Sequence, residues 1–207
     1  MSPSPVGQRQ ALPAHAEEGP NVPNEGGFTS ARVERVFLKC FGNSHRTRLL
    51  GGAAEPCYQP AQGEQRQHLL FYREDFFASA LHETAHWCIA GEARRELPDF
   101  GYWYAAQGRS AAAQREFEAV EDKPQALEWF FSQACGASFQ LSADNFDPHS
   151  GEVPDTSSFA QRVVAQALYW QRAGLPKRAE QFYCALCREF GTLLAPSQLS
   201  FLAADIR

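Results

Sequence analysis

One short segment constrains the fold of this chain more than any other: His82-Glu83-Thr84-Ala85-His86. Four residues advance an α-helix by about 400°, so the two imidazoles lie about 40° apart around the helix and about 6 Å apart along it. Both rings therefore reach one cation from the same face, and the glutamate after the first histidine lies close to any water on that cation. The segment predicts a metal-binding helix.

The sequence around this segment is almost entirely apolar, which predicts a largely buried helix over residues 76–90. We expect Asp75 to cap its first turn and Gly91 to end it. Two histidines and a glutamate inside such a helix are costly unless they are paired or bound to a metal. The alternative is a pair of hydrogen-bonded core histidines beside a salt-bridged Glu83.

The third metal ligand has to come from another part of the chain. The extended zinc motif needs a glycine and a third histidine further along, but those positions hold Ile89 and Glu92. A second helical pattern at residues 110–135 is rich in carboxylates. Within it Glu121 borders the apolar face and is the predicted ligand, while Glu118 points further outward and is the alternative.

A site with two histidines and one carboxylate leaves coordination positions open. It suits catalytic zinc with a bound water, and it equally suits non-haem Fe(II), which uses the same ligand types and leaves positions for oxygen. In a zinc metallopeptidase of this type, Glu83 acts as general base on the zinc-bound water. A non-enzymatic module with structural zinc is disfavoured, because such sites are closed and rich in cysteine, and Cys88 lies about 200° around the helix from His86.

The whole chain predicts a single, mostly helical α+β domain with a small β-sheet, and a metal site between two helices, one of them a zincin-like metal helix. Residues 1–27 contain many Pro, Gly and polar residues, which predicts a disordered tail before a catalytic domain at 28–207. The remaining expectations are a helix that begins near Thr29-Ser30, helices at 156–173 and 177–190, a break or kink of the 110–135 helix near Pro124, and strands at 46–50, 67–72 and 138–146.

The charge and hydropathy of the chain disfavour two classes of partner. With 19 basic against 24 acidic residues and a net charge of −5, the chain is unsuited to nucleic-acid binding through phosphate contacts. No apolar run approaches the roughly 20 residues that span a bilayer, and the first residues show no secretory signal. The six cysteines form no compact disulfide framework. We therefore expect a soluble, cytoplasmic protein with neither a nucleic-acid nor a membrane partner.

Three stretches of the chain together resemble the bacterial elongation factor P hydroxylases. They are the metal helix at 77–91 (FASALHETAHWCIAG), the segment after it at 93–104 with ARREL and DFGYWY, and the stretch 117–127 with FE, VE and KPQAL. The resemblance extends from about residue 31 to about residue 190 and leaves the N-terminal tail outside. The three stretches together are far more specific than the histidine segment alone.

The resemblance implies an enzyme that hydroxylates translation elongation factor P on a lysine that already bears a β-lysyl group, with Fe(II) and molecular oxygen. It matches His82 and His86 to the family's metal histidines, and both Glu121 and Glu118 to acidic positions of its second helix. The His-x-Asp…His signature of 2-oxoglutarate oxygenases is absent from the sequence, so we do not infer that cosubstrate. Glu83 is then expected to handle protons during oxygen activation or to hold a group beside the ligands. The zinc metallopeptidase remains the alternative.

A weaker pattern follows the metal helix. Asp99, Tyr102 and Trp103 are predicted to line a pocket for a cationic side chain, because carboxylates pair with ammonium groups and aromatic faces attract cations. The alternative is an aromatic loop that packs on the core.

Overall fold

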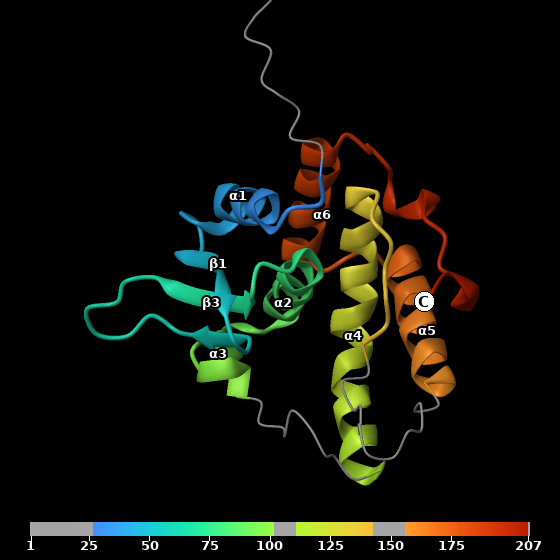
Figure 1. Ribbon diagram of the computed structural model, residues 1–207, viewed down its shortest axis with the longest axis horizontal. Helices are drawn as coiled ribbons and strands as arrows, with labels where there is room; N and C mark the ends of the chain where they lie inside the picture. The colour runs from blue at the N-terminus through green and yellow to red at the C-terminus, as the bar shows by residue number, and fades with distance from the viewer. Residues whose placement is uncertain (1–26, 102–110, 143–155, 207) are drawn as a thin grey trace, which may run out of the picture.

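The computed structural model describes residues 27–101, 111–142 and 156–206, and these form one mostly helical domain with a small sheet (Figure 1). Three short 3-10 helices, η1 (Pro98–Gly101), η2 (Pro196–Gln198) and η3 (Ala203–Asp205), accompany the main elements. The α-helices are α1 (Ser30–Phe41), α2 (Phe77–Ile89), α3 (Glu92–Arg95), α4 (Ala111–Cys135), α5 (Ser157–Ala173) and α6 (Lys177–Phe190), and the strands are β1 (Thr47–Ala53), β2 (Cys57–Gln59) and β3 (His68–Arg73).

The sheet has the order β1-β3-β2, with β1 parallel and β2 antiparallel to the central strand. Alternate residues of β3 are buried, as expected for a strand that packs on one face. The strands predicted at 46–50 and 67–72 are confirmed as β1 and β3. The sequence did not reveal β2, because three residues are too short to show a period of two.

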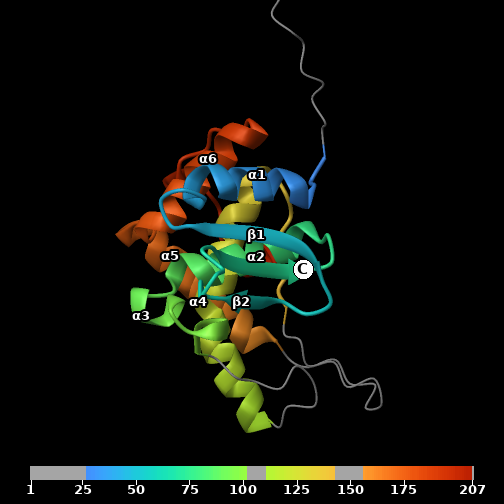
Figure 2. The same cartoon turned by 90° about the vertical axis from the view of Figure 1, so that its left-hand side faces the viewer.

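Helix α2, which contains the predicted metal-binding segment, lies between the sheet and α4. It packs against β3 on one flank and against α4 on the other. Figure 2, which views the molecule from the sheet side, shows the strands in front of α2. An aromatic cluster holds α2 to α1 and α6, since the ring of Trp87 lies 5.1 Å from Phe37 and 4.6 Å from Phe41, and Phe41 lies 6.1 Å from Phe182. One face of α2 is thereby fixed in the core while another faces α4.

Three predicted helices agree with the structure to within a residue or two, namely those at 76–90, 156–173 and 177–190. The first helix begins at Ser30 with Thr29 in the N-cap position, as expected. The predicted cap of α2 is wrong, because Phe76 occupies the N-cap position and makes no side-chain cap. Only three residues separate the end of β3 from the start of α2, and Asp75 lies one residue before the N-cap position.

Two expectations about the region after α2 need correction. Helix α4 is unbroken from Ala111 to Cys135 although it contains Pro124. Its packing against α2, α5 and α6 outweighs the single backbone hydrogen bond that the proline removes. The strand predicted at 138–146 does not form over 138–142, because the Gln125 side chain bonds both backbone groups of Ser142 in place of a partner strand; residues 143–146 lie outside the described part.

The predicted disordered tail at 1–27 lies outside the described residues except for its last position, so it stays a prediction. Among the described residues, no helix combines the length and the apolar character needed to cross a membrane.

Candidate metal centre

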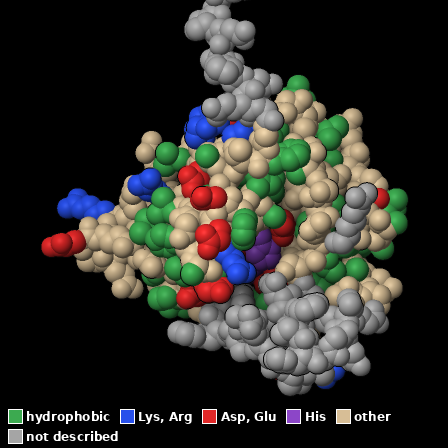
Figure 3. Space-filling view, in the orientation of Figure 1, with side chains coloured by type: hydrophobic (Ala, Val, Ile, Leu, Met, Phe, Trp, Pro, Cys, Tyr) green, Lys and Arg blue, Asp and Glu red, His purple; other side chains and the backbone are tan. Residues whose placement is uncertain are grey.

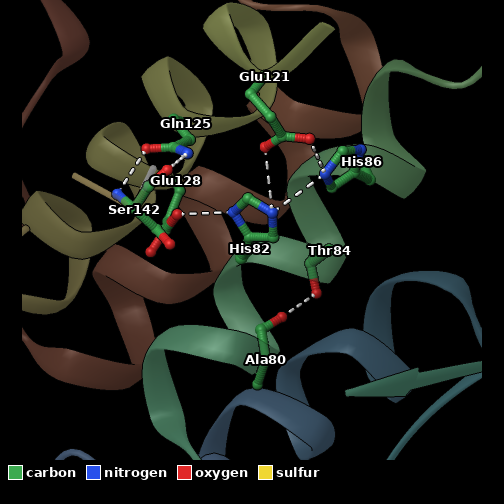
Figure 4. A network of polar contacts seen from close by, with 8 residues as sticks. All are labelled: Ala80, His82, Thr84, His86, Glu121, Gln125, Glu128 and Ser142. Carbon is green, nitrogen blue, oxygen red and sulfur yellow. Dashed lines mark hydrogen bonds and ion pairs between the residues drawn. The ribbon is translucent and has the colours of Figure 1, made fainter. Parts of the chain in front are cut away.

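Two histidines of α2 and one glutamate of α4 meet where the two helices pack together (Figure 4). The Nε2 atoms of His82 and His86 lie 3.1 Å apart. The Glu121 carboxylate faces both rings, with Oε1 3.2 Å from His86 Nε2 and Oε2 3.4 Å from His82 Nε2. Ligands about 2.1 Å from one divalent ion, at 90° to 109° from each other, lie about 3.0 to 3.4 Å apart. The triangle of His82, His86 and Glu121, in which each histidine nitrogen faces a different oxygen of the carboxylate, therefore has spacings that suit a single ion.

Burial gives an independent test of whether these residues fit a metal ion. Glu121 is only 1% exposed, and its Oε2 is buried without a hydrogen-bond partner among the described residues. Nearly all buried polar atoms in folded proteins have a partner, so an orphaned carboxylate oxygen beside two imidazole nitrogens needs an explanation. A cation between the three side chains would satisfy the carboxylate and both rings at once.

A second carboxylate, Glu128, lies behind His82. Its Oε2 is 2.9 Å from Nδ1 of His82, and the residue is only 6% exposed. When Nδ1–H donates to this carboxylate, the lone pair of Nε2 is left facing His86 and Glu121. Glu128 borders the apolar face of the predicted helix, as Glu121 does, and follows it by seven residues, which places both on one face of α4, but it was not among the predicted ligands.

The charges at the centre support each other in the metal-free protein. Burial alone would lower the pKa of His82, but the hydrogen bond with Glu128 and the charge of Glu121 outweigh it and raise this pKa to about 10. Burial would raise the pKa of Glu121, but the charge and hydrogen bond of His86 and the charge of His82 lower it to about 2. A metal ion would thus meet an ionised carboxylate and displace a proton from His82.

The predicted alternative ligand, Glu118, points elsewhere. Its Oε2 accepts a hydrogen bond from Arg162 Nη2 at 2.8 Å, and the same arginine bonds Asp122 through Nε at 3.1 Å. Arg162 belongs to α5, so these two carboxylates tie α4 to α5. Of the two candidate glutamates, the structure brings Glu121 to the histidines.

The remaining predicted site residues are not part of the triangle. Glu83 is partly buried on α2, and burial raises its pKa. Within the described part of the chain no hydrogen bond or ion pair joins its carboxylate, so its catalytic role stays a prediction. Asp99 Oδ1 accepts the backbone N–H of Tyr58 at 2.7 Å. Tyr102 and Trp103 lie outside the described residues, and the pocket predicted from these three residues also stays a prediction.

The centre reaches the molecular surface through His82, whose side chain is 21% exposed. Figure 3 shows a histidine surface near the middle of the visible face, with acidic side chains beside it. A substrate atom can therefore approach the metal position without opening the core.

Comparison with known proteins points to one family. The family model described as elongation factor P hydroxylase matches residues 36–199, a span that contains the three residues of the triangle. A Haemophilus influenzae protein named elongation factor P lysine hydroxylase is 46% identical over 157 residues, which cover 76% of this chain and 86% of the relative.

Proposed function

The chain belongs to the elongation factor P hydroxylase family, and from this premise we propose that it is a non-haem iron-dependent monooxygenase. Its substrate is the β-lysylated lysine of translation elongation factor P, its cosubstrate is molecular oxygen, and its place of action is the cytoplasm. Residues 28–207 form its catalytic domain, with α2 as a zincin-like metal helix. The observation that carries the proposal is the triangle of His82, His86 and Glu121, the ligand set of non-haem iron oxygenases.

Each residue of the centre has a role that its position supports. His82, His86 and Glu121 hold Fe(II), which when bound supplies the activation of oxygen for attack on a C–H bond. Glu128 fixes the tautomer and the ring orientation of His82. Glu83, with its raised pKa, holds or delivers a proton beside the ligands.

The alternative function is a zinc metallopeptidase that uses Glu83 as general base. It needs the same three ligands, so the triangle by itself does not separate the two. Family membership favours hydroxylation, and the peptidase has no support beyond the ligand set.

Intact-mass measurement and peptide mapping of elongation factor P test the proposal. Inserting one atom of dioxygen into a C–H bond and reducing the other atom to water takes two electrons and two protons, so the assay includes an external reductant. Modified elongation factor P is incubated with anaerobically purified, Fe(II)-loaded enzyme and then exposed to air. The expected result is a gain of one oxygen atom on the β-lysylated lysine.

Two variants control this experiment. His82→Ala removes a ligand and should abolish the mass gain, whereas Gln161→Ala changes an exposed position on α5 and should not. An unchanged substrate mass with fully metallated wild-type enzyme would contradict the hydroxylase. Cleavage fragments that disappear with His82→Ala would establish the peptidase instead.

A further inference from the structure

A cavity of about 900 Å³ lies next to the metal centre, and His86 is one of its lining residues. The end of α2, the short α3, the middle of α4 and the second half of α5 form its walls. This volume falls within the roughly 300 to 1,000 Å³ that is common for ligand pockets. Because the His86 Nε2 belongs to the triangle, a group inside the cavity comes close to the metal position.

The lining of this cavity suits a long aliphatic chain with polar groups. Ile89, Phe100, Pro124 and Trp170 give it apolar walls. Gln166 and the charged residues Glu92, Arg94 and Lys123 also line it, and so does Tyr169, which is 56% exposed. Such a mixture buries methylene groups while it leaves partners for N–H donors.

Pro124 leaves one backbone carbonyl next to the cavity without its helical donor. A proline has no N–H, so it cannot donate the helical hydrogen bond to the carbonyl oxygen four residues earlier, which is that of Val120. Val120 and Pro124 both line the cavity, and Glu121 lies between them in sequence. A backbone carbonyl that loses its helical donor needs another one, and a bound N–H group can supply it.

We propose that this cavity receives the modified lysine side chain of the protein substrate, with its methylene groups on the apolar walls and an N–H donor on the Val120 carbonyl. The inference rests on the proposed function and names the part of the molecule that recognises the substrate.

Blocking the cavity tests this proposal. Gln166→Trp places a large ring in the cavity from α5, whereas Gln161→Trp makes the same change at an exposed position of the same helix that does not line it. Binding of modified elongation factor P to Fe(II)-loaded enzyme is measured without oxygen, so that no turnover occurs, and hydroxylation is then measured in air. We expect Gln166→Trp to weaken binding and raise KM by about tenfold or more with full metal content, and Gln161→Trp to change neither.

Pro124→Ala tests the role of the Val120 carbonyl. Alanine restores the missing N–H and closes the helical hydrogen bond, so the variant should melt at the same or a higher temperature. We expect it nevertheless to bind the modified factor several-fold more weakly, because the carbonyl is no longer available. This combination excludes misfolding as the cause of the weaker binding.

The outcomes separate this proposal from the proposed function. Wild-type affinity in Gln166→Trp would overturn the cavity as the lysine site, and wild-type affinity in Pro124→Ala would overturn the role of the Val120 carbonyl. Weaker binding in both variants supports the proposal even if the wild-type enzyme binds the factor without hydroxylating it. That last result would count against the monooxygenase alone.

Discussion

Glu121 and Glu118 lie three residues apart on α4, yet their carboxylates face different partners. Glu121 faces His82 and His86, and Glu118 pairs with Arg162. We predict that Glu121→Gln weakens Fe(II) binding by more than about 100-fold, because it replaces a charged ligand, whereas Glu118→Gln binds like wild type. Metal titration by calorimetry measures both. If Glu118→Gln lost more affinity than Glu121→Gln, the third ligand would have to be reassigned.

The carboxylate of Glu128 lies behind His82 and is predicted to control how that ring presents Nε2. Glu128→Gln keeps the shape of the side chain but removes the charge that holds the Nδ1 proton. We expect metal affinity to fall about 10- to 100-fold, the range typical of groups that orient a histidine ligand. Glu116→Gln, at an exposed position of α4, is the matched control. Equal affinities of the two variants would show that Glu128 does not orient His82.

Metal binding should also depend on pH, and the protonation of the site predicts that affinity rises with pH. The pKa of His82 is raised to about 10, so this ring carries a proton in the metal-free protein at neutral pH, while the Glu121 pKa of about 2 leaves that carboxylate ionised. A metal ion must displace the His82 proton. Below pH 10 the apparent Kd for the metal should therefore fall by up to about tenfold for each unit by which the pH rises. Titrations at about pH 6 and about pH 8 measure this slope, and an unchanged Kd would contradict it.

The cluster of His82, His86 and Glu121 could be predicted from the sequence, but the contacts of the residues around it could not. The spacing of His82 and His86 is fixed by helix geometry, and the apolar face of α4 indicated Glu121. The contacts of Glu128 and Arg162 depend on how α4 packs against α2 and α5, and one helix pattern contains no such information.

At the scale of elements, the C-terminal end of α2 is held by two arginines. Arg178 of α6 donates to the carbonyl oxygens of Trp87, Cys88 and Ala90, with 3.0 Å to that of Cys88, and Arg95 Nη1 donates to the Ala90 oxygen at 2.8 Å. These bonds satisfy carbonyl groups that have no partner within the helix and place positive charge at the negative end of its dipole.

We predict that Arg178→Met lowers the free energy of unfolding by about 2 to 3 kcal/mol, because it leaves the carbonyl groups of Trp87 and Cys88 without this donor while the methionine retains apolar contact near Trp87. Denaturant unfolding measures the change. Arg172→Met, at an exposed position of α5, should alter stability by less than about 0.5 kcal/mol. A similar loss in both variants would mean that the hydrogen bonds from Arg178 to the end of α2 contribute little to stability.

The elements that the sequence missed share a physical cause. Helical periodicity over more than ten residues revealed α2, α5 and α6. By contrast, β2 pairs with an edge that β3 offers it, and at Ser142 the Gln125 side chain bonds the backbone N–H and C=O groups that a partner strand would need. The continuity of α4 through Pro124 likewise depends on three packed neighbours. Tertiary contacts determined the structure in each of these cases, and a local sequence pattern carries no information about such contacts.

At the scale of the whole molecule, the metal centre joins two parts of the fold. Helix α2 packs on the sheet and on α1, whereas α4 packs on α5. Both helices also contact α6, and the triangle lies where α2 and α4 meet. An ion bound there crosslinks the two parts in the folded state. In the unfolded chain Glu121 is no longer held next to His82 and His86. The ion therefore binds the folded state far more tightly than the unfolded state.

Metal should therefore stabilise the whole domain by mass action. At a free Fe(II) concentration about 100 times the Kd, we predict a gain of about 2.7 kcal/mol in the free energy of unfolding, and a melting temperature that rises with metal concentration and falls with a chelator. Anaerobic thermal unfolding measures this. Glu121→Gln should remove the dependence, because without the α4 ligand the ion no longer links α4 to α2, while Glu118→Gln should retain it. If the melting temperature of the wild type did not change with metal concentration, no ion would join the two helices at this site.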